Sequence, residues 1–261
     1  MRPLFFVGNK RSGTSHLGRL LNLHPRVAVT HESDCVWLLY RAANGLPLED
    51  PYPWDGDLGL RATLGAAGHL FDRTQLRHGD RGAVRRTFTT VQLHLLRNGS
   101  AVQQPGVKPH RELIWLGDKK PVQQADPEIL DFTLRNFPDA RFVHIVRHPA
   151  AAVTSMLRQG RNGARVAFWR GDPTEVVHHW GVHERWALAA AERAPVHRIR
   201  YEDLVAEPEI TLQGLFSFLD VETDADVLDR AREQTHATPP VYTDTYDLEA
   251  VRDLMDLYAY A

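Results

Sequence analysis

The chain has 261 residues, 43% of them hydrophobic and 25% charged, and 31 basic residues stand against 33 acidic ones for a formal net charge of −2. This composition is typical of a globular domain with a substantial core, and it excludes a polybasic surface of the kind that binds nucleic acid. Cys35 is the only cysteine, so an intrachain disulfide is excluded. We therefore expect any anion to bind through a few local residues.

The first apolar run, residues 4–7, is too short for a signal peptide or a membrane helix and leads straight into a glycine-containing loop. No segment of the chain approaches the apolar length that a membrane helix needs. We expect a soluble, cytoplasmic chain with no membrane insertion and no nucleic-acid partner. The sequence leaves the oligomeric state open.

The N-terminal third begins with a strand–helix–strand pattern. Residues 4–7 predict a strand buried on both faces, and residues 8–15 predict a loop. Leucines at helical spacing in residues 17–21 predict a helix, and a second strand then ends near His31 and Glu32. Residues 36–111, broken by prolines and glycines, predict helices joined by loops that cover a substrate site.

The remaining chain alternates strands with helices. Residues 113–116 predict a strand that residues 117–121 stop, and Asp126 is a good cap for a helix to about residue 137. The later expectations are a strand at 141–146, a helix from 149, an arginine-rich loop or lid at 159–172, a helix at 173–193, a strand at 196–201 and a helix from 207. The tail from Thr235 has no assignment.

This alternation predicts one α/β domain over residues 1–261, with a central, mainly parallel sheet flanked by helices and a P-loop-like phosphate-binding loop. Sites in such sheets gather beyond the carboxyl ends of the strands. The residues just past those ends are therefore the candidates. They are the loop 8–15, His31, Glu32, Asp118, Lys119, Arg147 and Tyr201.

The loop 8–15 reads Gly-Asn-Lys-Arg-Ser-Gly-Thr-Ser and lies between a predicted strand and a predicted helix. Glycine allows close backbone approach, the helix start offers free N–H groups, and Thr14 and Ser15 add hydroxyl donors. We interpret the loop, including Lys10, as a phosphate cradle. The alternative is a plain turn with a solvated Lys-Arg pair.

Two features argue against a magnesium–triphosphate site. A nucleotide-hydrolase P-loop has a lysine directly after its second glycine, and this chain has Thr14 there. The strand at 141–146, which would supply an acidic magnesium ligand, ends instead at Arg147, and a cation there suits an additional phosphate. A metal site at His178, His179 and His183 is a weaker alternative to an amphipathic helix surface.

Four separated motifs resemble those of the sulfotransferases that use 3′-phosphoadenosine 5′-phosphosulfate (PAPS). Residues 11–15 resemble the family's 5′-phosphosulfate loop. Residues 141–149, with Ser155 eight positions after Arg147, resemble its 3′-phosphate motif. Residues 117–121 and 201–204 resemble two further signatures. The matches span residues 4–219, and their spacing resembles the tyrosylprotein and related Golgi-type branch more than the cytosolic aryl branch.

The resemblance implies a role for each motif. Residues Arg11, Ser12, Gly13, Thr14 and Ser15 would hold the 5′-phosphosulfate, Arg147 and Ser155 the 3′-phosphate, and Tyr201 would lie near the nucleotide. Glu32 falls where the tyrosylprotein branch has its catalytic base, and Lys119 where it has a transition-state cation, which Arg11 would assist. His31 is the rival base because its ordinary pKa lies closer to neutrality. Lys119 and Lys120 could instead be solvated, Lys120 more readily.

The sequence thus predicts a sulfotransferase that uses PAPS as co-substrate, releases adenosine 3′,5′-bisphosphate and needs no metal. The acceptor would carry a hydroxyl or amine, and we expect a small molecule. Two alternatives stay open: a metal-dependent, kinase-like P-loop phosphotransferase and a non-catalytic nucleotide-binding module.

Overall fold

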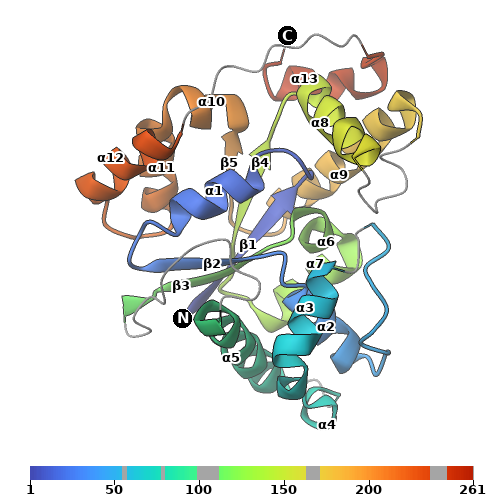
Figure 1. Cartoon of the computed structure of the whole chain (residues 1–261), viewed down its shortest axis with the longest axis vertical. Helices are drawn as coiled ribbons and strands as arrows, with labels where there is room; N and C mark the ends of the chain where they lie inside the picture. The colour runs from blue at the N-terminus through green and yellow to red at the C-terminus, as the bar shows by residue number, and fades with distance from the viewer. Residues whose placement is uncertain (55–57, 78–79, 99–111, 163–170, 236–245, 261) are drawn as a thin grey trace.

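A five-stranded parallel sheet forms the centre of the protein (Figure 1). The structure is a computed structural model that describes residues 1–54, 58–77, 80–98, 112–162, 171–235 and 246–260. Its strands are β1 Arg2–Gly8, β2 Val27–His31, β3 Trp115–Lys119, β4 Arg141–Val146 and β5 Val196–Arg200. They lie in the order β2-β3-β1-β4-β5, and every neighbouring pair is parallel. The predicted single α/β domain is confirmed.

Helices flank the sheet on both sides. Their bounds are α1 Thr14–Leu21, α2 Cys35–Ala43, α3 Leu58–Ala67, α4 Arg73–Leu76, α5 Arg81–Asn98, α6 Pro121–Ala125, α7 Pro127–Asn136, α8 Pro149–Arg161, α9 Pro173–Ala191, α10 Tyr201–Ala206, α11 Pro208–Phe218, α12 Ala225–Gln234 and α13 Arg252–Leu257. Within the described residues they are accompanied by the short 3₁₀ turns η1 Gly68–Leu70 and η4 Glu249–Val251. Figure 1 shows α1, α10, α11 and α12 on one side of the sheet and α2, α3 and α5 on the other.

The central strand β1 explains this arrangement. Successive residues of β1 point to opposite faces of the sheet. Both faces are covered, so the apolar side chains of β1 are fully buried. Phe5 and Val7 join a core with α2, α5 and α7, whereas Leu4 and Phe6 join a second core with α1, α11 and α12. A third core connects α8, α9 and the C-terminal segment 246–260. The unalternating run at residues 4–7 is thus a strand covered on both faces, as predicted.

The third strand differs from its prediction. It begins at Trp115 and continues through the motif that was expected to stop it. Gly117 aligns with Leu4 on one side and Val29 on the other, and a Cβ there would lie 2.9 Å from the Leu4 carbonyl oxygen. The polar residues that suggested a loop are instead buried strand residues, because their side chains have partners. β3 also separates β1 from β2, so the first 32 residues do not pair with each other directly.

Smaller differences lie at other element ends. Tyr201 begins α10 rather than ending β5, and α8 runs to Arg161, through the first residues of the expected loop at 159–172. Residues 163–170 of that expectation lie outside the described residues. The unassigned tail contains η4 and α13. In the part of the chain that the structure describes, no helix combines the length and apolar character required to cross a membrane.

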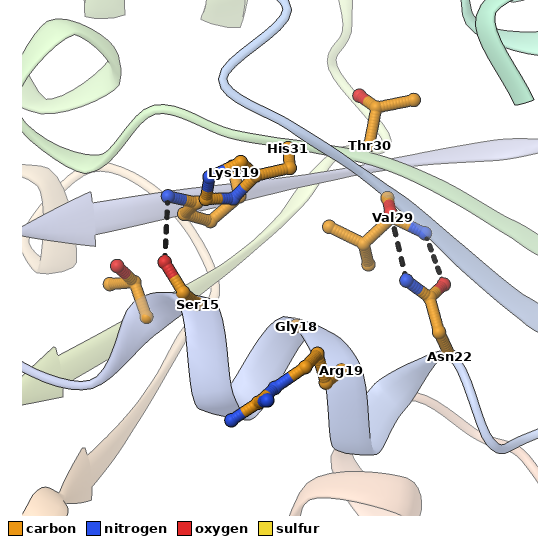
Figure 2. Close-up of a pocket in the computed structure, with 9 residues that line it drawn as sticks. Ser15, Gly18, Arg19, Asn22, Val29, Thr30, His31 and Lys119 are labelled. Atoms are coloured by element: carbon orange, nitrogen blue, oxygen red, sulfur yellow. Dashed lines mark hydrogen bonds between the residues drawn. The ribbon is translucent and has the colours of Figure 1, made fainter. Parts of the chain in front are cut away.

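A side-chain link fastens α1 to β2 beneath the candidate loop. The Asn22 amide donates from Nδ2 to the Val29 carbonyl at 2.9 Å and accepts from the Val29 N–H at 2.8 Å (Figure 2). This pair satisfies both backbone groups of a strand residue at the edge of the sheet. It fixes α1, the helix that follows the loop, relative to the strand that ends at His31.

Replacing Asn22 with alanine should lower the free energy of unfolding by about 1–3 kcal/mol, because two partly buried backbone groups lose their partner. Urea denaturation measures the change. The matched control is Asn98→Ala, since the exposed Asn98 amide donates to the His94 carbonyl of its own helix. Equal effects of the two substitutions would contradict the interpretation.

Candidate functional site

The carboxyl ends of five parallel strands meet at one edge of the sheet. The loop 9–13 follows β1, Glu32 follows β2, and Lys119 ends β3. Arg147 follows β4 and Tyr201 follows β5. The sequence candidates therefore come together at this edge, although Asn9 and Tyr201 are 192 positions apart along the chain.

The loop after β1 has a backbone shaped for close approach. Arg11 and Gly13 both have positive φ angles, 63° and 96°. The N–H groups of the first turn of α1 have no partner within the helix, as in any helix. Gly13, the residue before α1, provides no side-chain cap for them. The Ser12 hydroxyl is buried and has no hydrogen-bond partner among the described residues. Such a set of donors suits a bound anion.

Lys119 connects three of the strand ends. Its ammonium donates to Glu32 Oε1 at 2.7 Å and to Ser15 Oγ at 3.2 Å, and Figure 2 shows the second contact. The Lys119 side chain is 2% exposed and that of Glu32 is 50% exposed. Burial lowers the pKa of Lys119, and the Glu32 carboxylate partly offsets this. The lysine is thus a buried cation between the loop and a carboxylate that solvent reaches.

The charge states of the two candidate bases follow from the same cations. Burial raises the pKa of Glu32, but Lys119 and Lys120 outweigh burial and bring it to about 2. Burial and the charge of Lys119 lower the pKa of His31 to about 4. Above pH 5, Glu32 is therefore ionised and His31 is a neutral imidazole. His31 lies beside Lys119 and faces the cleft between α1 and β2 (Figure 2).

Lys10 occupies an unusual position for a phosphate-loop cation. Its ammonium donates to the carbonyl of Trp54, in the region that precedes α3. Burial, followed by the charge of Lys120, lowers the pKa of Lys10 to about 7. An anion in the loop would favour the charged form of this side chain.

Two arginines, Arg11 and Arg147, link the loop after β1 to the segment that follows β4. Arg11 Nε donates to Ser155 Oγ at 3.0 Å, and Arg147 Nη1 donates to the Arg11 carbonyl at 3.2 Å. The Arg147 guanidinium lies 4.5 Å from the centre of the Tyr201 ring. That ring also covers Gly13, where a Cβ would be 2.2 Å from Tyr201 Cδ2. These contacts therefore join five predicted site residues into one contiguous unit: Arg11, Gly13, Arg147, Ser155 and Tyr201.

Sequence reasoning missed the support beneath Glu32. Lys120, for which a solvated side chain was the favoured alternative, is 4% exposed. It donates to Asp34 Oδ2 at 2.8 Å, and Gln123 donates to Asp34 Oδ1 at 2.7 Å. Glu32 and Asp34 both have positive φ, so this buried pair holds a strained turn. The aspartate two positions after Glu32 was the available signal.

A metal centre at the histidines of α9 gains no support from their contacts. The His183 Nδ1 atom is engaged with Asn9 Oδ1 at 3.1 Å, and the His179 ring packs against Trp54. Among the residues that the structure describes, no three or more His, Cys, Asp or Glu side chains are grouped to hold a metal ion.

Comparisons with known proteins identify the fold and the family. A model of the sulfotransferase family matches residues 3–225. The sulfotransferase domain from the curacin biosynthetic pathway is similar in structure, with a TM-score of 0.63 and 19% identity over 100% of this chain and 99% of that one. The sulfotransferase domain of the Synechococcus PCC 7002 olefin synthase gives 0.61 and 20%, over 100% and 95%.

A Mycobacterium avium sulfotransferase gives a TM-score of 0.54 and 15% identity, over 99% of this chain and 75% of that one. At these identities the structural neighbours establish a shared fold. No curated protein matches the chain by sequence.

Anion binding should make Lys10 take up a proton. Its pKa of about 7 leaves it mostly neutral at pH 8, and a phosphate in the loop would raise that pKa, so up to about one proton should be taken up per site. Calorimetric titration with adenosine 3′,5′-bisphosphate at pH 8, in buffers of different ionisation enthalpy, measures the uptake. Lys10→Met should abolish it. Uptake that persists in this variant would assign the proton to another group.

Proposed function

Because the chain belongs to the sulfotransferase family, we propose that it transfers a sulfuryl group from PAPS to an acceptor hydroxyl or amine. The observation that carries this proposal is the Arg11–Ser155–Arg147 unit. It joins the loop before α1 to Arg147, a second cation just after β4, the strand beside β1 in the sheet. A donor with a 5′-phosphosulfate and a 3′-phosphate fits two adjoining anion sites.

In the proposed complex the 5′-phosphosulfate occupies the loop of residues Lys10 to Ser15. The orphaned Ser12 hydroxyl and the helix-start N–H groups support this placement. Arg147 and Ser155 hold the 3′-phosphate, since a guanidinium forms strong paired hydrogen bonds with phosphate oxygens. Tyr201, which packs on Gly13 and Arg147, borders the nucleotide.

The transfer is an in-line displacement at sulfur. The acceptor oxygen or nitrogen forms a bond to sulfur while the bond between sulfur and the bridging phosphate oxygen breaks. Adenosine 3′,5′-bisphosphate leaves, and Glu32 takes the acceptor proton. Lys119 and Arg11 stabilise the negative charge that develops on the sulfuryl and leaving oxygens. These protein cations perform the electrostatic work, so the proposal requires no metal.

The half-exposed Glu32 carboxylate suits the role of base, because an acceptor from solvent can reach it. Its low pKa of about 2 reflects the surrounding cations. An anionic donor bound to those cations would raise this pKa and make the carboxylate a stronger base. His31, at the end of β2, is partly buried and less exposed than Glu32, so an acceptor from solvent reaches it less readily.

The acceptor side is formed by the region 36–111, whose described part consists of α2 to α5 and their connections. We propose that this region covers the acceptor and that the acceptor is a small molecule. We also propose the tyrosylprotein-type branch, because Glu32, directly after β2, accepts a hydrogen bond from Lys119 at the end of β3, and these are the positions of that branch's base and transition-state cation. A panel of phenols, alcohols, sugars and amines with labelled PAPS, in excess EDTA, tests the activity. Transfer that requires magnesium would contradict the metal-free mechanism.

The 3′-phosphate assignment predicts a nucleotide preference. Adenosine 3′,5′-bisphosphate should raise the melting temperature more than AMP does, because it fills both anion sites of the native state. Arg147→Ala should remove most of this difference, since it deletes the paired donors. Arg232→Ala, which removes a surface arginine paired with Glu209, is the control and should keep the preference. A normal preference in Arg147→Ala would make Arg147 structural.

Replacing the proposed base should separate chemistry from binding. Glu32→Gln keeps the shape of the side chain but accepts no proton, so kcat should fall by about 10²–10⁴ while bisphosphate binding stays near normal. His31→Asn should cost much less. Steady-state kinetics with an acceptor from the panel measure both variants. Retained activity in Glu32→Gln together with loss in His31→Asn would assign the base to His31.

A further inference from the structure

A buried carboxylate on α9, Glu184, is hydrogen-bonded to Asn9 at the start of the proposed phosphate loop. Glu184 is 0% exposed, and its Oε1 accepts a hydrogen bond of 2.9 Å from the side-chain amide of Asn9. Asn9 is itself fully buried and precedes Lys10 in the loop. The same amide also donates to the Trp180 carbonyl at 2.8 Å. The start of the loop is thus fixed by α9.

The other oxygen of Glu184 receives two further donors. Arg198 Nε donates to His144 Nδ1 at 3.3 Å, so the His144 ring proton resides on Nε2. That Nε2 donates to Glu184 Oε2 at 2.8 Å. The hydroxyl of Tyr258, beyond α13, donates to the same oxygen at 3.1 Å. The C-terminal segment therefore completes the environment of the carboxylate that fixes Asn9.

A second carboxylate repeats this arrangement at the other anion site. Glu202 on α10 accepts from the backbone N–H of His148 at 3.1 Å through Oε1. Its Oε2 accepts from the hydroxyl of Tyr260 at 2.7 Å. His148 directly follows Arg147 at the end of β4. Hydrogen bonds through Glu184 thus link Tyr258 to the loop after β1. Hydrogen bonds through Glu202 link Tyr260 to His148, next to Arg147.

The tail is firmly seated in this position. Tyr258 and Tyr260 are 3% and 4% exposed, and their rings lie 5.2 Å from the Arg198 guanidinium and 4.6 Å from the Arg200 guanidinium. Val251 and Leu254 pack into the core formed with α8 and α9. Figure 1 shows α13 next to these helices. Burial and the neighbouring carboxylate raise the pKa of each tyrosine, so both hydroxyls remain donors.

We propose that the C-terminal segment 246–260 is a positioning element for the nucleotide, with a separate tyrosine for each anion site. Tyr258 acts through Glu184 on Asn9 and the loop, and Tyr260 acts through Glu202 on His148 and Arg147. The ligand class is an adenosine nucleotide with 5′- and 3′-phosphates, so the proposal rests on the function proposed above. Neither tyrosine needs to touch the nucleotide.

Single Tyr258→Phe and Tyr260→Phe variants test this division, because each removes one hydroxyl and keeps the packed ring. Calorimetry should show that Tyr258→Phe weakens adenosine 3′,5′-bisphosphate and AMP by the same factor, about 3- to 10-fold. Tyr260→Phe should weaken the bisphosphate by a similar factor and leave AMP nearly unchanged. A purely structural role would lower the melting temperature without this difference in selectivity.

Tyr52→Phe is the matched control, since its hydroxyl donates to Asp126 Oδ2 at 2.9 Å in a buried tyrosine–carboxylate pair on other elements. It should change neither affinity. Unchanged affinities in both tail variants, or equal loss for both nucleotides in both, would overturn the proposal. Wild-type protein that binds neither nucleotide would overturn the proposed function and this inference with it.

Amide hydrogen exchange gives a readout without ligand. Exchange in residues 9–13 should accelerate in Tyr258→Phe, and exchange at His148 should accelerate in Tyr260→Phe. Uniform acceleration across the sheet in both variants would contradict the separate roles.

Discussion

The buried ammonium of Lys119 is the contact on which the arrangement of the site depends. It lies at the end of β3, between β1 and β2 in the sheet, and donates both to Ser15 at the start of α1 and to Glu32 after β2. A buried cation without a partner would be costly, so the carboxylate and the hydroxyl must stay beside it. The proposed phosphate loop, the proposed base and the proposed transition-state cation are thereby held in one geometry before any ligand binds.

The overall charge of the chain gives no hint of this local concentration of cations. The net charge is −2, yet the parallel sheet directs Lys10, Arg11, Lys119 and Arg147 to one edge. The pKa of Arg11 is lowered, first by burial and then by repulsion from the charge of Arg147. A polyanionic donor would relieve this repulsion, which favours binding of a bisphosphate over a neutral ligand.

Much of this could be predicted from sequence, because strand ends are marked by abrupt changes from apolar to polar residues. That signal located β1, β4 and the candidates after them. It failed at β3, where Asp118 and Lys119 are polar strand residues whose partners come from distant segments. Glu184 and the tail tyrosines escaped detection for the same reason, since their hydrogen bonds join distant segments, and Glu184 lies 175 positions from Asn9, its partner in the candidate loop. Lys120 resembled a solvated lysine until Asp34 was placed beside it.

The most direct test of the central claim is a crystal structure of the protein with adenosine 3′,5′-bisphosphate. We expect the 5′-phosphate at the N-terminus of α1, within hydrogen-bond distance of the loop N–H groups, and the 3′-phosphate between Arg147 and Ser155. The Lys119–Glu32 contact should persist beside it. A nucleotide bound away from this edge, or a 3′-phosphate that faces solvent, would contradict the account.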